Sequence, residues 1–157
     1  MTNTPPAMLV SAVRLVLDEV FDPELPILTI AELGVLRAVR IDGGDVTVVI
    51  TPTYSGCPVM HAIDQDIRHA LAAAGYHDVK IETQLAPAWS TDQLSEAAHA
   101  KLREMGIAPP AQHTQAVTCP RCASAQTERI SEFGSTACKA LYRCRSCLEP
   151  FDYFKCL

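Results

Sequence analysis

The first half of the chain carries two kinds of hydrophobic periodicity. Apolar residues recur at helical spacing in two segments, and β-branched residues cluster or alternate as in strands in three others. The predicted elements are a helix over residues 8–21, strands over 35–41 and 46–51, a helix over 59–74 and a strand over 79–85. Gly43 and Gly44 between the first two strands are typical of a hairpin turn. The pattern therefore predicts a small α/β domain.

Capping motifs and a change of composition divide the rest of the chain. Thr29 and Glu32 have capping-box spacing and predict a short turn closed by Gly34. Ser90 and Gln93 have the same spacing and predict a further helix, which Gly106 ends. Residues 109–116 show no apolar periodicity. We therefore expect an α+β protein with a first domain over 1–108, a linker over 109–117 and a second domain over 118–157.

Composition and charge narrow the class of protein. Of the 157 residues 48% are apolar and 20% charged, which is ordinary for a globular protein. No apolar run approaches the roughly 20 residues that span a bilayer, and no secretory signal is visible. We therefore expect a cytoplasmic protein without a membrane partner. Residues 1–118 carry a formal charge of −7 and residues 119–157 one of +2, which argues against a nucleic-acid surface.

Four cysteines in the tail form two Cys-x-x-Cys pairs. Cys119 and Cys122 make the first pair, and Cys144 and Cys147, 21 residues further on, make the second. Two such pairs can complete a closed tetrahedral zinc site. A rubredoxin-type iron centre or two redox disulfides are the alternatives. A tail of about forty residues is too short to fold on core burial alone, so we expect the metal to stabilise it.

Two further cysteines lie near the ends of predicted strands in the tail. Three short strands are expected over residues 129–133, 140–144 and 151–156. If the last two form a hairpin centred on Cys147, Cys138 and Cys156 face each other across it. Such a secondary thiol pair would be a reversible disulfide, a second metal site or simply two small buried residues.

The seventh cysteine, Cys57, lies between the strand over 46–51 and the following helix. It precedes Pro58, and proline suits the first position of a helix. A sulfur at a helix N-terminus meets unpaired N–H groups and the positive end of the dipole, which favour the thiolate. Cys57 is therefore a candidate reactive thiol. The alternative is a small apolar residue at a strand-to-helix corner.

Three motifs resemble the SufT-like family of iron–sulfur assembly factors. They are Asp22-Pro23-Glu24, the segment Ile30 to Val35, and the segment Thr51 to Met60 that contains Gly56-Cys57-Pro58. The resemblance implies a small α/β fold over about residues 8–86. It also implies that Cys57 is the family's reactive cysteine and that Asp22 and Glu24 are its acidic motif. Turn chemistry at a helix end is the alternative for the acidic pair.

The remainder resembles the PaaD family, accessory proteins of the bacterial phenylacetyl-CoA epoxidase (ring 1,2-epoxidase). The matching segments are residues 87–92, 101–103, 106–110 and 149–156. This resemblance implies a role in aerobic phenylacetate degradation, as an accessory subunit that helps to mature the metal centres of the epoxidase. It also implies that the four paired cysteines form the family's zinc ribbon.

The resemblance makes the oxygenase and reductase components of the epoxidase, and iron–sulfur assembly proteins, the expected partners. We expect no enzyme activity of the chain itself, because no nucleophile–base set stands out. One thiolate cannot hold an iron–sulfur cluster alone, so a homodimer that joins two Cys57 thiols is predicted. His61, one turn after Cys57, is either an assistant to the thiol or a solvated side chain. Two other functions stay open: a non-catalytic adaptor that docks epoxidase components, and a zinc-ribbon nucleic-acid binder.

Overall fold

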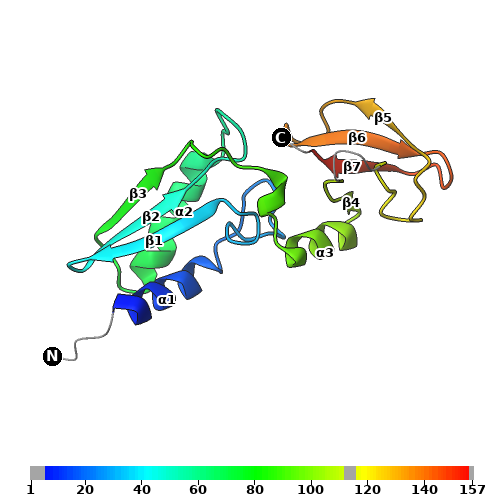
Figure 1. The fold of residues 1–157 in the computed structure, drawn as a ribbon. Helices are drawn as coiled ribbons and strands as arrows, with labels where there is room; N and C mark the ends of the chain where they lie inside the picture. Colours follow the sequence, from blue (N-terminus) through cyan, green and yellow to red (C-terminus); the bar gives the residue numbers. More distant parts are fainter. Residues whose placement is uncertain (1–5, 112–115, 156–157) are drawn as a thin grey trace. The chain divides into compact units, whose positions relative to one another are not determined.

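The protein forms two compact units, residues 1–89 and 90–157, in a computed structural model that describes residues 6–111 and 116–155 (Figure 1). Each unit has its own sheet: three strands in the first and four in the second. Within the described ranges no helix has both the length and the apolar character needed to cross a membrane.

The first unit has the predicted order of helix, hairpin, helix and strand. Its elements are α1 (Pro6–Leu17), β1 (Leu36–Asp42), β2 (Asp45–Ile50), α2 (Met60–Ala73) and β3 (Val79–Thr83). The sheet order is β1-β2-β3, with an antiparallel β1–β2 pair and a parallel β2–β3 pair (Figure 1). The β2–β3 pair is parallel because α2 returns the chain to the end of the sheet at which β2 begins. The α/β prediction for this half is confirmed.

The core of the first unit lies between the two helices and the sheet. The helices α1 and α2 contact each other, and they pack against β1 and β3. The fully buried residues include Val13 and Leu17 of α1, Val48 and Ile50 of β2, and Ile63, Ile67 and Leu71 of α2. These are the positions that the helical and alternating patterns select. The central strand β2 is therefore fixed immediately before the loop that contains Cys57.

Two predicted turns in this unit are confirmed. The hairpin turns at Gly43 and Gly44, whose φ values of 58° and 104° lie in the region that favours glycine. The Thr29 N–H donates to Glu32 Oε2 at 3.0 Å, and the Glu32 N–H donates to Thr29 Oγ1 at 3.1 Å. This reciprocal capping box closes a turn rather than a full helix.

The second unit contains more than the predicted three-stranded ribbon. Its elements are the 3₁₀ turn η1 (Thr91–Gln93), α3 (Glu96–Glu104), β4 (Ile107–Ala108), β5 (Thr127–Ser131), β6 (Lys139–Cys144) and β7 (Pro150–Phe154). The sheet order is β4-β7-β6-β5 (Figure 1). The fourth strand is β4, which pairs in parallel with β7 through Ile107–Asp152 and Ala108–Tyr153.

The boundary between the two units, at residues 89 and 90, therefore lies before the expected linker at 109–117. The pairing of β4 with β7 and the burial of Ala108 beside Cys119, Cys144 and Phe151 tie residues 107–108 to the ribbon. Helix α3 contacts β4 and belongs to the same unit. A two-residue strand has no periodicity, which is why the sequence did not indicate it.

Helix α3 begins later than its predicted cap. Ser90 precedes only η1, and its side chain makes no capping hydrogen bond. The chain is extended at Leu94, and Ser95 is the cap, with its Oγ accepting from the Ala98 N–H at 3.0 Å. Because Ser95 is followed by Glu96 in the first turn, it has the stronger local signal for a helix start.

The register of the β6–β7 hairpin is one residue away from the predicted register. Lys139 pairs with Phe154 and Ala140 with Tyr153. The backbone N–H of Cys144 donates to the Glu149 carbonyl at 3.0 Å, which fixes where the turn closes. The Cys138 carbonyl accepts from the Lys155 N–H at 3.0 Å. The predicted facing of Cys138 and Cys156 stays a prediction. Cys156 itself lies outside the described residues.

Candidate functional site

The four paired cysteines lie together at one end of the ribbon. Their sulfur atoms all lie within 4.8 Å of one another. The Sγ atoms of Cys119 and Cys147 are 3.8 Å apart, and those of Cys122 and Cys144 are 3.5 Å apart. A tetrahedral zinc ion with Zn–S bonds of about 2.3 Å separates its sulfurs by about 3.8 Å. The thiols therefore fit zinc, and they leave no open coordination position.

The two Cys-x-x-Cys knuckles have the same backbone construction. In each, the N–H of the first cysteine donates to the carbonyl five residues later: Cys119 to Ser124 at 2.9 Å, and Cys144 to Glu149 at 3.0 Å. In each, the residue after the second cysteine has a left-handed φ, 61° at Ala123 and 65° at Leu148. Both loops curl in this way so that two thiols point at one place.

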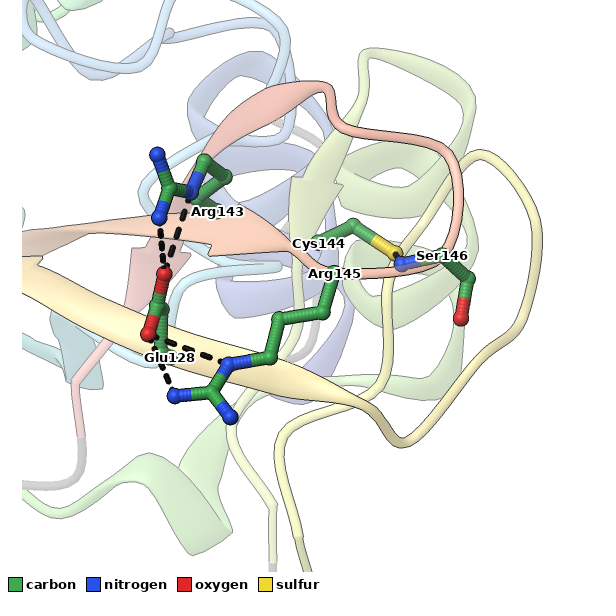
Figure 2. Close-up of polar contacts among 5 residues, drawn as sticks. All are labelled: Glu128, Arg143, Cys144, Arg145 and Ser146. Atoms are coloured by element: carbon green, nitrogen blue, oxygen red, sulfur yellow. Dashed lines mark hydrogen bonds and ion pairs between the residues drawn. The ribbon is translucent and has the colours of Figure 1, made fainter.

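Backbone and hydroxyl groups hold the knuckles in position. The Ser146 N–H approaches the Cys144 sulfur at 3.4 Å (Figure 2). The Cys147 N–H approaches the same sulfur at 3.5 Å. The Cys147 N–H contributes most to lowering the pKa of Cys144 to about 6, with help from Ser146 and against the effect of burial. The hydroxyls of Ser124 and Ser146, one from each knuckle, lie 2.8 Å apart. Cys144 is therefore the cysteine that these contacts prepare to ligate as a thiolate.

The Glu128 carboxylate of β5 accepts hydrogen bonds from two arginines and so links β5 to the second knuckle. Glu128 accepts from Arg145 Nη2 at 2.6 Å and from Arg143 Nε at 3.0 Å (Figure 2). The hydrogen bonds from Arg145 and then Arg143 lower the pKa of Glu128. Because Arg145 lies between two zinc ligands, this exposed network orients the knuckle more than it stabilises the fold.

Cys57 belongs to the first unit, in the loop between β2 and α2. It is half-buried, and its N–H donates to the Tyr54 carbonyl at 3.2 Å. Helix α2 begins at Met60 with Val59 as its N-cap. Pro58 therefore belongs to the preceding turn and is not the first helical residue, contrary to the prediction.

The surroundings of Cys57 favour the neutral thiol. Burial has the largest effect in raising its pKa, and the negative charge of Glu24 raises the pKa further. Hydrogen bonds from the Val59 N–H and from the side chains of Thr53 and Tyr54 act in the opposite direction but do not prevail. The expectation that the helix start favours the thiolate is therefore wrong, because desolvation outweighs the nearby N–H group.

The two acidic residues of the motif, Asp22 and Glu24, lie in different surroundings. Asp22 is buried, and its Oδ1 accepts from the N–H groups of Glu24 and Leu25, each at 2.9 Å. Asp22 thus shapes the turn, the alternative that its sequence left open. Glu24 is half-buried and close enough to Cys57 to shift its pKa. His61 is exposed in the first turn of α2.

Two hydroxyl residues beside Cys57 were not predicted. The side chains of Thr53 and Tyr54 lie close enough to its thiol to lower the pKa of Cys57. Their place in the same tight loop, four and three residues before the cysteine, is the sequence signal that points to them. Cys138, in the second unit, is buried, and its Sγ lies 3.0 Å from the Thr136 hydroxyl oxygen.

Models of two known families match the two parts of the chain. Residues 11–83 match the family described as "Iron-sulfur cluster assembly protein", and residues 108–155 match the "PaaD zinc beta ribbon domain". The fold of the first part is similar to a DUF59 domain from Bacillus anthracis, with a TM-score of 0.58 and 25% identity over 62% of this chain and 93% of that one. A conserved hypothetical protein from Thermotoga maritima is also similar, with a TM-score of 0.50 and 29% identity over 59% of this chain and 91% of that one. These matches define an iron–sulfur assembly type of domain joined to a zinc ribbon.

Whole-chain similarity identifies the family. The chain is 49% identical to a "Putative 1,2-phenylacetyl-CoA epoxidase" component of Escherichia coli (strain K12), over 99% of this chain and 97% of that protein. It is also 35% identical to an "Fe-S protein maturation auxiliary factor" of Porphyromonas gingivalis, over 53% of this chain and 80% of that protein. The chain therefore belongs to the PaaD family.

Proposed function

We propose that this chain is an accessory subunit of a phenylacetyl-CoA epoxidase system that assists the assembly of its iron–sulfur or di-iron centre. Cys57 is the residue through which iron or a cluster is handled. The observation that carries the proposal is the closeness of Glu24 to this thiol, whose pKa its charge raises, in a loop of the first unit that contains none of the four paired cysteines. The 49% identity to the epoxidase component of Escherichia coli supports the system in which it acts.

The chemistry of the pair suits a transient cation. Burial and the charge of Glu24 keep the Cys57 thiol protonated when no metal is present. An arriving ferrous ion reverses both effects, because the ion displaces the proton and the carboxylate becomes a favourable neighbour. Binding therefore releases a proton, and protonation of the sulfur releases the metal. Such a site accepts and gives up metal more easily than a permanent thiolate site.

One thiol and one carboxylate supply too few ligands for a cluster. Iron–sulfur clusters are usually held by four cysteines. The remaining ligands must come from a second copy of the chain or from the recipient protein. We propose a dimer in which two Cys57 thiols share the cargo, and we expect ferrous iron to shift the zinc-loaded chain toward a dimer in sedimentation velocity.

The zinc ribbon has a structural role in this proposal. Its four thiols fit a closed tetrahedral ion, which supplies folding energy and no open position for a reactant. Among the described residues, these four cysteines are the only group of three or more metal-binding side chains placed to hold an ion. The chain is accordingly proposed to be an accessory component without enzyme activity of its own.

Metal content of the epoxidase in cells tests the proposal. Cells that express the epoxidase components with wild-type chain, Cys57→Ser or Cys138→Ser are compared for iron in each purified component. We expect Cys57→Ser to lower the iron content of at least one component, whereas Cys138→Ser leaves it unchanged. Equal iron content with Cys57→Ser, at equal levels of the chain, would contradict the proposal.

A docking adaptor is the second candidate. Ile130 and Phe133, at and just beyond the edge strand β5, are 53% and 62% exposed, as contact residues of an interface often are. Pull-down of epoxidase components with Ile130→Asp and Phe133→Asp separates the two functions. Loss of binding with these variants, together with normal metallation by Cys57→Ser, favours the adaptor.

A further inference from the structure

The four paired cysteines of the ribbon differ in their exposure to solvent. Cys119 and Cys144 are buried, at 1% and 0% exposure, Cys147 is half-buried, and Cys122 is exposed. Zinc is bound by thiolates, so in the loaded site thiolate character does not distinguish the four ligands. Oxidants modify the thiolates that solvent can reach, so exposure decides which ligand is modified first. Cys122 is therefore the ligand most open to a dissolved oxidant.

The sulfur atoms of Cys122 and Cys144 lie in contact across the two knuckles. They are 3.5 Å apart, and those of Cys119 and Cys147 are 3.8 Å apart. A disulfide bond is about 2.05 Å long, so Cys122 and Cys144 need to approach each other by roughly 1.5 Å to form one. The ligand that an oxidant reaches first thus has a second thiolate beside it, from the opposite knuckle.

Two contacts that involve no thiol hold the knuckles against each other. The hydroxyls of Ser124 and Ser146 lie 2.8 Å apart, and the Arg145 N–H donates to the Gln126 carbonyl at 2.7 Å. Oxidation of a zinc ligand leaves these groups chemically unchanged. They therefore keep the two knuckles together while the sulfur chemistry takes place.

We propose that Cys122 is an oxidation site for hydroperoxides, and that its oxidation joins it to Cys144 in a disulfide and releases the zinc ion. The site goes beyond the proposed function and does not depend on it, because the chemistry requires neither Cys57 nor iron. It gives the ribbon, otherwise a structural element, a response to peroxide.

The reaction balances with one molecule of hydrogen peroxide. The Cys122 thiolate attacks one peroxide oxygen: an S–O bond forms, the O–O bond breaks, hydroxide leaves, and Cys122 becomes a sulfenic acid. The Cys144 thiolate then attacks the Cys122 sulfur: the S–S bond forms, the S–O bond breaks, and a second hydroxide leaves. The two sulfurs have together given two electrons to the peroxide. Two of the four thiolates, Cys119 and Cys147, remain, which is too few for a closed tetrahedral site.

Peroxide treatment of the zinc-loaded full chain tests the proposal. Hydrogen peroxide is added in the presence of a zinc-binding dye, free thiols are then blocked, and disulfides are mapped by mass spectrometry of an unreduced tryptic digest. Trypsin cleaves after Arg121, Arg143 and Arg145, so each of the four ligands falls in a peptide of its own. We expect zinc release to proceed together with a Cys122–Cys144 disulfide, at about one disulfide per zinc ion. Dithiothreitol followed by added zinc should restore the loaded form.

Histidine substitutions separate the role of Cys122 from zinc binding in general. Cys122→His retains a zinc ligand and removes the thiolate, so peroxide is expected to release zinc at least about tenfold more slowly. Cys119→His, the same change at a buried ligand, is the matched control and is expected to release zinc within about twofold of the wild-type rate. Each variant is first shown to hold one zinc ion per chain. If either does not, the disulfide map of the wild type decides.

Three results overturn the proposal. The first is retention of zinc by the wild type in millimolar peroxide. The second is zinc release with a disulfide other than Cys122–Cys144, such as one within the first knuckle, and the third is release from Cys122→His at the wild-type rate. None of these measurements involves iron, so failure here leaves the proposed role of Cys57 untouched, and unchanged metallation with Cys57→Ser leaves the ribbon chemistry untouched.

Discussion

Glu24 lies close enough to Cys57 that its negative charge adds to the effect of burial and raises the pKa of the thiol. The two residues are 33 positions apart in the chain, and the turn built around Asp22 brings the carboxylate to the loop after β2. A thiol and a carboxylate held together in this way repel a second negative charge and attract a cation.

Neutralising Glu24 should make Cys57 more reactive. Glu24→Gln removes a charge that disfavours the thiolate, so the pKa of Cys57 falls and iodoacetamide alkylates it several-fold faster at pH 7.5. Peptide-resolved mass spectrometry of the zinc-loaded chain measures the rate at Cys57 alone. Glu19→Gln, at an exposed acid of the same unit, is the control and should change nothing. A slower reaction with Glu24→Gln is incompatible with this arrangement.

Zinc removal should unfold the ribbon of the second unit and leave the first unit folded. The ribbon has a small core around Ala108, Cys119, Cys144 and Phe151, and its two knuckles converge on the metal site. Chelation, or Cys144→Ser, is therefore expected to abolish the dispersion of the NMR signals of residues 116–155 while those of residues 6–83 persist. Cys57→Ser should retain one zinc ion per chain. Retention of the ribbon signals after complete zinc removal would show that the metal is not structural.

Glycine should suit the left-handed residue of the second knuckle better than leucine. Leu148 is 71% exposed and has a φ of 65°, so it adopts an unfavourable backbone conformation without contributing to the core. Leu148→Gly is expected to stabilise the zinc-loaded protein by about 0.5–1 kcal/mol, measured by denaturant unfolding. Glu149→Gly, at the next residue, should instead destabilise it. A loss of stability with Leu148→Gly would mean that the leucine makes a stabilising contact despite its exposure.

Gly134 should not accept a side chain. A Cβ atom at this position would collide with the Asp152 carboxylate and touch the Ala140 carbonyl carbon at 3.4 Å. Gly134→Ala is expected to destabilise the ribbon by about 1–3 kcal/mol. Because the worst collision is with a side chain, Asp152→Ala in the same chain should restore part of the loss in a double-mutant cycle. Strict additivity of the two changes would count against this contact.

The sequence was sufficient for the elements with strong local signals. Five elements of the first unit follow from periodicity, and the zinc ligands follow from the spacing of Cys119, Cys122, Cys144 and Cys147. The capping box of Thr29 and Glu32 was also visible, because both its hydrogen bonds are local. Local signals identify local structure well.

The features that the sequence did not indicate depend on contacts between distant segments. Strand β4 exists only because β7 offers it a free edge, and so the unit boundary moved to residues 89 and 90. The hairpin register follows from the Cys144–Glu149 backbone bond, which the predicted centre at Cys147 did not include. The thiolate expected at Cys57 was wrong because burial and Glu24, both tertiary effects, outweigh the N–H group of Val59.

The central claim is that Cys57 handles iron, and an anaerobic titration of the purified, zinc-loaded full chain tests it most directly. Ferrous iron and sulfide are added to wild type, Cys57→Ser and Cys138→Ser, and visible absorption and protein-bound iron are measured after desalting. We predict iron–sulfide absorption bands in wild type and Cys138→Ser and their loss in Cys57→Ser, with zinc retained in all three. Equal bands in Cys57→Ser, or none in wild type, would contradict the claim.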